Sequence, residues 1–125
     1  MEEAEVIFQS ENNKKICIKC EIAQTLNEKM KGLMFREHLQ ESKGMLFVFR
    51  LAWHRFFWMK NVKIPLDIIF VDSKLKIIHI SQANVEKGIC FRNYWSHGLC
   101  KYVIETNQGF CKKNNILKGT KIKIN

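Results

Sequence analysis

The sequence predicts a mainly β (β-rich α+β) domain of about eight short strands with one or two short helices, arranged as a small barrel or sandwich. Its length of 125 residues suits a single domain covering residues 1–125. Hydrophobic residues make up 46% of the chain, which is enough to fill a core. Apolar and polar residues alternate in short runs, the pattern of half-buried strands.

Eight runs show this alternation and are the predicted strands. They are Glu5–Phe8, Lys15–Ala23, Met45–Phe49, Arg55–Met59, Leu66–Val71, Leu75–Ser81, Lys101–Glu105 and Lys121–Ile124. In the fourth run, either Phe57 and Met59 or Phe56 and Trp58 form the buried face, because alternate side chains of a strand point to opposite sides.

A capping-box pattern predicts a short helix after the second strand. Thr25 can accept a hydrogen bond from the backbone at Glu28 while the Glu28 side chain reaches back, and Gly32 ends the helix. The predicted buried stripe of this helix is Leu26, Met30 and Leu33. A second short turn, from Phe110 to Asn114, is predicted near the C-terminus, with Thr106 or Asn107 as its cap.

The segment between Ser81 and Lys101 has no clean periodicity. It contains Phe91, Tyr94 and Trp95, too many aromatic residues for a solvated tether, so we expect it to fold back over the domain. Two interpretations stay open, a satellite hydrophobic cluster and a lid over a ligand site.

The chain is basic, with a formal net charge of +9. Residues 63–125 hold eleven basic and four acidic side chains, so most of the excess lies in this half. A positive electrostatic field of this kind attracts nucleic acid, anionic membranes or acidic small molecules. A lysine-rich surface can also simply reflect a biased genome composition. The first residues lack the basic start of a secretory signal, and no apolar run is long enough to span a bilayer. We therefore expect a soluble, cytoplasmic protein with no membrane partner.

Neither a metal nor a cofactor is predicted. The five cysteines are expected to be thiols, and Cys17 and Cys20 lie in one strand with their side chains on opposite faces. Cys90, His97 and Cys100 supply three possible zinc ligands without a clear fourth. The four histidines do not cluster in the sequence, and common nucleotide, zinc-protease and hydrolase motifs are missing.

Polar residues follow the aromatic run at the centre of the chain. Lys60 and Asn61 offer cationic and amide donors, and Asp67, just after Pro65, offers a carboxylate. The plainer alternatives are that Asp67 accepts from turn amides and that Lys60 extends along an apolar strand.

Five segments together resemble a known family. They are Gly32–Arg36, Gly44–Phe49, Phe57–Asn61, Pro65–Asp72 and Tyr102–Glu105 with Asn107 and Gly109. In order and spacing they resemble the domain of unknown function 192, also called uncharacterised protein family 0127. The resemblance implies a compact, mainly β, barrel-like domain and no established reaction, cofactor or partner. It also implies that the polar motif positions are Arg36, Lys60, Asn61, Asp67 and Glu105. The connection before Tyr102 departs from the family pattern, because it has Cys90 and Cys100 but no proline.

Our first hypothesis is a domain that binds a small polar or anionic ligand at the mouth of the barrel. Arg36, Lys60 and Asn61 supply donors, and Trp58 with the Phe91–Trp95 segment supplies apolar cover. Asp67 and Glu105 complete the candidate ligand-binding set.

Two alternatives come from other classes. An enzyme would use Asp67 or Glu105 as the acid or base beside Lys60, which requires the groups to lie within hydrogen-bond reach. A basic nucleic-acid-binding module would use the lysine-rich C-terminal tail. Its lysines are Lys112, Lys113, Lys118, Lys121 and Lys123.

Overall fold

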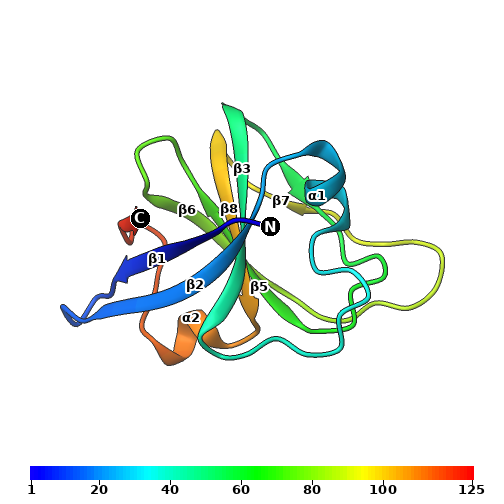
Figure 1. The fold of residues 1–125 in the computed structure, drawn as a ribbon, viewed down its shortest axis with the longest axis horizontal. Helices are drawn as coiled ribbons and strands as arrows, with labels where there is room; N and C mark the ends of the chain where they lie inside the picture. The colour runs from blue at the N-terminus through cyan, green and yellow to red at the C-terminus, as the bar shows by residue number, and fades with distance from the viewer.

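The computed structural model describes residues 1–125, and a seven-stranded sheet curled into a half-barrel forms its body (Figure 1). The strands are β1 (Glu3–Gln9), β2 (Lys15–Ala23), β3 (Lys43–Trp53), β5 (Leu66–Val71), β6 (Ile77–Ala83), β8 (Cys100–Asn107) and β9 (Ile122–Ile124). Their order in the sheet is β6-β5-β8-β3-β2-β1-β9. All neighbours are antiparallel except β2 and β3, which are parallel. The predicted mainly β class is confirmed.

A two-stranded ribbon and two short helices complete the fold. The ribbon pairs β4 (Phe56–Phe57) with β7 (Tyr94–Trp95), and the helices are α1 (Leu26–Lys31) and α2 (Phe110–Lys113). The sequence did not predict β7, because two residues are too short to show a period. As expected, its segment folds back onto the domain, and Tyr94 is only 9% exposed.

The C-terminal segment links the two edges of the curled sheet. β9 pairs with β1, and just before it Lys76 and Lys121 form an isolated bridge beside β6. The Ile77 amide also donates to the Thr120 carbonyl at 2.9 Å. We call the apolar cluster enclosed by this curl the inner core. It includes Val6, Phe8, Ile18, Leu46, Ile69, Val71, Ile77, Ile104, Phe110 and Ile122.

A second cluster, the outer core, covers the opposite face of the central strands. Figure 1 shows α1 and β7 on one side of β3, with β1, β2 and α2 on the other. The sheet contributes Met45, Phe47, Leu66, Ile68, Phe70 and Val103, and the covering segments contribute Leu33, Leu39, Met59, Val62, Ile64 and Tyr94. Phe57 packs against this core, and Met59 is completely buried in it. Of the two faces considered for the aromatic run, Phe57 and Met59 therefore form the buried one.

The caps of α1 match the prediction, but its buried stripe does not. Thr25 Oγ1 accepts from the Glu28 amide, and Glu28 Oε1 accepts from the Thr25 amide, both at 3.1 Å. The predicted burial of Leu26 and Met30 is wrong, since they are 72% and 66% exposed. The helix is only six residues long and contains no buried residue. The chain turns into the outer core only after the helix ends, at Leu33, which is 1% exposed as predicted.

The predicted cap of the second helix is also wrong. α2 begins after Gly109 and has no side-chain cap from its own segment. Thr106 is buried, and the Asn107 side chain donates to the Leu39 carbonyl at 2.6 Å instead. Both residues belong to β8, so pairing in the sheet determines where their side chains lie.

Because nothing on α1 is buried, its caps contribute directly to its stability, together with the hydrogen bond from Lys29 Nζ to the Val48 carbonyl. Thr25→Ala removes the acceptor for the Glu28 amide, and we expect it to lower the local stability of α1 by about 1 kcal/mol. Amide hydrogen exchange at Lys29 and Gly32, whose amides bond within this turn, measures the change. Thr25→Ser retains the acceptor and should exchange like the wild type. Equal exchange in the two variants would contradict this role of the hydroxyl.

Candidate functional site

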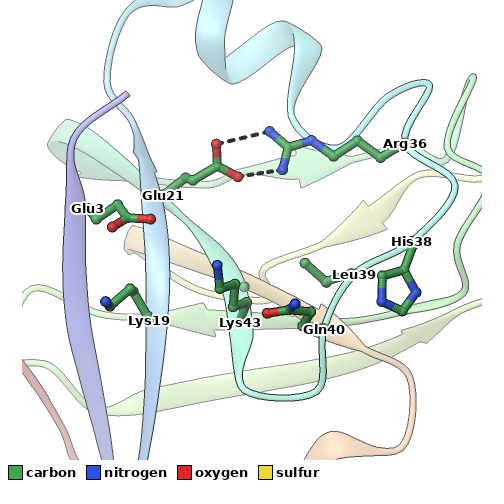
Figure 2. Close-up of a pocket in the computed structure, with 9 residues that line it drawn as sticks. Glu3, Lys19, Glu21, Arg36, His38, Leu39, Gln40 and Lys43 are labelled. Carbon is green, nitrogen blue, oxygen red and sulfur yellow. Dashed lines mark hydrogen bonds and ion pairs between the residues drawn. The ribbon is translucent and has the colours of Figure 1, made fainter.

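A polar cleft of about 360 Å³ lies between strands β1 to β3 and the loop that follows α1 (Figure 2). Its lining consists of Glu3, Lys19, Glu21, Arg36, His38, Leu39, Gln40, Lys43 and Gly44. Leu39 is the only hydrophobic residue among them. We call this site the Arg36 cleft. Its lining suits a polar ligand rather than an apolar one.

Strand register brings the charged side chains of the cleft together. Glu3 lies opposite Glu21, and Lys19 lies opposite Lys43. Residues opposite each other on adjacent strands point to the same face, so two like-charged pairs lie side by side. Such pairs are unfavourable unless an opposite charge compensates them. Arg36 compensates Glu21. Lys19 lies opposite Glu5 on β1, and neither Lys19 nor Lys43 comes within 4 Å of a carboxylate oxygen.

Arg36 bonds to Glu21 through both of its terminal nitrogens (Figure 2). Nη2 lies 3.2 Å from Oε1, and Nη1 bonds to Oε2. The hydrogen bond from Arg36 is the largest influence on Glu21 and holds the pKa of this carboxyl below its usual value. The amino terminus and Lys43 act in the same direction. Arg36 is thus anchored in the cleft while part of its side chain, 33%, stays exposed.

Two unusual backbone conformations position Arg36. The Phe35 amide donates to the Asn61 carbonyl at 2.8 Å, and both residues have left-handed φ angles, 67° and 59°. Asparagine accepts this conformation readily, but a bulky residue such as phenylalanine rarely does. The strain at Phe35 marks the loop as a candidate functional segment. It also places the candidates Arg36 and Asn61 on neighbouring segments.

Glu105 lies in the same cross-strand row as Glu21. Glu21 is opposite Met45, and Met45 is opposite Glu105, so the Cα atoms of the two glutamates are two strands apart, roughly 10 Å. Glu105 is 4% exposed, and burial is the one influence that shifts the pKa of its carboxyl. Burial raises its pKa to about 8, so the carboxyl is mainly protonated at neutral pH. A side chain at Gly32 would begin 3.8 Å from its Oε1, which places the carboxyl beside the end of α1.

Asp67 faces the other side of the sheet. Its carboxylate accepts from the Gly109 amide at 3.3 Å and from the Cys111 amide at 3.0 Å, so it holds the start of α2. The next residue, Ile68, is the one opposite Glu105. Since neighbouring residues of a strand point to opposite faces, the two candidate carboxylates cannot form an acid–base pair.

Trp58 and Lys60 form a separate group at the surface. Lys60 Nζ lies 5.3 Å from the centroid of the Trp58 ring, and Trp58 packs edge-on against Phe91 at 5.9 Å. Lys60 forms no ion pair with Asp67 or Glu105. The structure therefore divides the predicted site residues among several places rather than one pocket.

Sequence reasoning missed most of the cleft lining. The alternation of β2 places Lys19 and Glu21 on one face, and this signal was present in the sequence. Their pairing with Lys43 and Glu3 depends on strand register, which the pattern of a single strand does not contain.

Two of the histidines lie together in the structure, although the four do not cluster in the sequence. The rings of His79 and His97 are 4.4 Å apart, because the folded-back segment carries His97 to β6. Burial, followed by the charge of His97, lowers the pKa of His79. No group of three or more potential metal ligands is present, and all five cysteines are free.

The fold and the cleft define a small β half-barrel domain with a polar cleft outside its inner core. The chain belongs to the DUF192 family, described as "Uncharacterized ACR", whose model matches residues 7–124. The resemblance found in the motifs is thus confirmed over nearly the whole chain.

Two solved structures have the same fold. A protein described as a "putative transcription regulator" from Sinorhizobium meliloti 1021 is 26% identical, with a TM-score of 0.90 over 98% of this chain and 94% of that chain. A protein of unknown function from Novosphingobium aromaticivorans DSM 12444 is 31% identical, with a TM-score of 0.85 over 95% of this chain and 83% of that chain. None of the curated proteins matches the sequence. The structure contains no helix with the length and hydropathy needed to cross a membrane.

The raised pKa of Glu105 predicts a pH-dependent stability. Between its ordinary value of 4.5 and about 8, the folded state holds a proton that the unfolded state releases, so the free energy of unfolding falls as pH rises. Glu105→Gln removes this titration and should flatten that part of the profile, with a difference of a few kcal/mol developing between pH 4.5 and 8. Urea unfolding at several pH values measures the slope. Glu11→Gln, at an exposed turn, is the control, and a Glu105→Gln profile parallel to the wild type would refute the assignment.

The bonds of Asp67 predict a structural cost for its removal. Asp67→Ala leaves the Gly109 and Cys111 amides without their acceptor, and we expect the free energy of unfolding to fall by about 3 kcal/mol. Asp67→Asn keeps one oxygen acceptor and should lose less. The control is Asp72→Ala, since Asp72 also accepts two amides, at Lys74 and Lys76, but in an exposed turn that water can solvate. Denaturant unfolding compares them, and equal losses at the two aspartates would argue against this role.

Proposed function

We propose that the protein binds a small anionic, polar ligand in the Arg36 cleft. The main support is the pair Lys19 and Lys43, which lie opposite each other on β2 and β3, line the cleft and form no ion pair within 4 Å, with Glu5 as the acidic strand partner of Lys19. An anionic group placed between them would relieve their repulsion and gain two charge-assisted hydrogen bonds.

The balance of charges narrows the ligand class. Arg36 is already engaged by Glu21, so the available cations are the two lysines. Glu3, opposite Glu21, leaves a carboxylate that can accept a hydrogen bond from the ligand. The volume of about 360 Å³ lies in the lower part of the range for small-molecule sites, about 300–1,000 Å³. A small carboxylate or phosphate compound with further hydrogen-bonding groups fits these features.

Other residues of the cleft would orient the ligand. His38 and Gln40 come from the loop and add hydrogen-bonding groups on the side opposite the strands (Figure 2). Asn61 acts through its backbone, since its carbonyl holds the Phe35 amide next to Arg36. In this proposal Arg36 and Asn61 keep a role at the site, while Trp58 and Lys60 belong to another surface.

The geometry supports binding better than acid–base catalysis. Asp67 accepts hydrogen bonds from the start of α2. The fully buried Met45 separates Glu105 from Glu21 in their cross-strand row. Lys60 contacts neither carboxylate. Asp67, Glu105 and Lys60 therefore do not form the acid–base pair that the enzyme hypothesis requires.

Thermal unfolding with anionic probes tests the proposal. We expect citrate or inorganic phosphate at millimolar concentration to raise the Tm of the wild type by several degrees, relative to sodium chloride of equal ionic strength. Lys43→Ala should lose most of this rise, because it removes one of the two available cations. Lys74→Ala, which removes an exposed lysine from the turn between β5 and β6, should retain it. A rise that is equal in both variants would show non-specific ion binding and would contradict the proposed site.

A further inference from the structure

The β4–β7 ribbon presents a group of exposed aromatic rings. Phe56 lies opposite Trp95, with ring centroids 5.0 Å apart, and Trp58 packs against Phe91. Phe56 is 52% exposed, Trp95 47% and Trp58 44%. Large aromatic side chains that lie together at the surface usually mark an interaction site. We call Phe56, Trp58, Phe91 and Trp95 the aromatic surface.

The other face of the ribbon anchors these rings to the domain. Phe57 packs against Phe47 with centroids 4.9 Å apart, and its strand partner Tyr94 is buried in the outer core. Backbone bonds continue the pairing, since the Ser96 amide donates to the Arg55 carbonyl at 2.8 Å. Ser96 Oγ accepts from the Arg55 amide at 3.0 Å. The aromatic surface is therefore held in place before any partner arrives, which lowers the entropic cost of binding.

The segments that carry the aromatic surface are rich in basic residues. Residues 44–66 and 84–101, which contain the ribbon, hold seven basic side chains and one acidic one. Lys60 Nζ lies over the Trp58 ring. The Arg92 guanidinium lies 5.9 Å from the centroid of the Tyr94 ring, which belongs to the anchored face of the ribbon. The one acidic residue, Glu86, accepts from the Arg92 amide at 2.9 Å and from the Tyr94 hydroxyl at 3.4 Å. A partner that stacks on Trp58 therefore meets an aromatic ring and a cation together.

We propose that the aromatic surface binds single-stranded nucleic acid. Unpaired bases would stack on Trp58 and Trp95, and a phosphate between them would lie near Lys60. Base stacking requires bases that are free of a duplex, so a single strand fits and a double helix does not. The site is distinct from the Arg36 cleft, because the two share no residue. The aromatic surface also differs from the C-terminal lysines on which the sequence-based nucleic-acid hypothesis rested. Aromatic rings are not interleaved with those lysines.

Fluorescence anisotropy with a fluorescein-labelled 20-mer of thymidine, at about 50 mM salt where phosphate contacts are strongest, tests the proposal. We expect Trp58→Ala and Trp95→Ala each to weaken binding about tenfold. Lys60→Ala should lower the slope of log K against log salt by about 0.7. Trp53→Ala is the matched control, because Trp53 is 65% exposed but packs on His54, outside the aromatic surface, and should change binding less than twofold.

Conservative variants distinguish the loss of a stacking ring from a loss of folding. Trp58→Phe and Trp95→Phe keep a stacking ring, and we expect them to retain most of the affinity. No binding of the 20-mer at about 50 mM salt, or an equal loss in Trp53→Ala, would overturn the proposal. It would also be overturned if the Trp58→Ala and Trp95→Ala variants bound the 20-mer normally but lost binding to vesicles of phosphatidylglycerol and phosphatidylcholine, which would assign the rings to lipid. Lys43→Ala tests ligand binding in the Arg36 cleft and changes no residue of the aromatic surface. A negative result for one of the two proposals therefore leaves the other untouched.

Discussion

The register that joins β2, β3, β8 and β5 is the constraint on which the other features of this protein depend. It places Glu21, Met45, Glu105 and Ile68 in one row across four strands. A shift of one residue in any of these pairings would exchange the side chains of a strand between the inner and outer cores. Both cores are almost entirely apolar, so such a shift would bury charge and expose hydrophobic side chains, which makes the observed register strongly preferred.

The same register gives two buried carboxyls different surroundings. Asp67 and Glu105 lie on neighbouring strands at adjacent row positions but on opposite faces. The Asp67 carboxylate accepts hydrogen bonds from two backbone amides at the start of α2. The Glu105 carboxyl lies on the face of the outer core, where burial raises its pKa to about 8 and favours the neutral form. The face of the sheet on which each side chain lies therefore decides whether the carboxyl has hydrogen-bond partners or an apolar environment.

Segments outside the sheet carry most of the side chains that form the two proposed binding sites. The loop after α1 brings Arg36, His38 and Gln40 to the strands. The β4–β7 ribbon covers the outer core with Phe57 and Tyr94 and turns Phe56 and Trp95 outward. Each covering segment thus has one apolar face that secures it and one exposed face with polar or aromatic groups. This division lets the molecule offer a polar cleft and an aromatic surface without altering its cores.

Local sequence patterns were sufficient to predict several strands and the caps of the first helix. Alternation predicted β2 and β5 at their observed bounds, and the Thr25–Glu28 capping box predicted α1, because periods and caps depend only on residues close in sequence. The family resemblance also singled out Arg36 and Glu105 as candidate site residues, but it did not indicate their surroundings. The pairing of Lys19 with Lys43, the burial of Glu105 and the partners of Asp67 required the folded chain. These features depend on register and on contacts between distant segments, and no local pattern of residues contains that information.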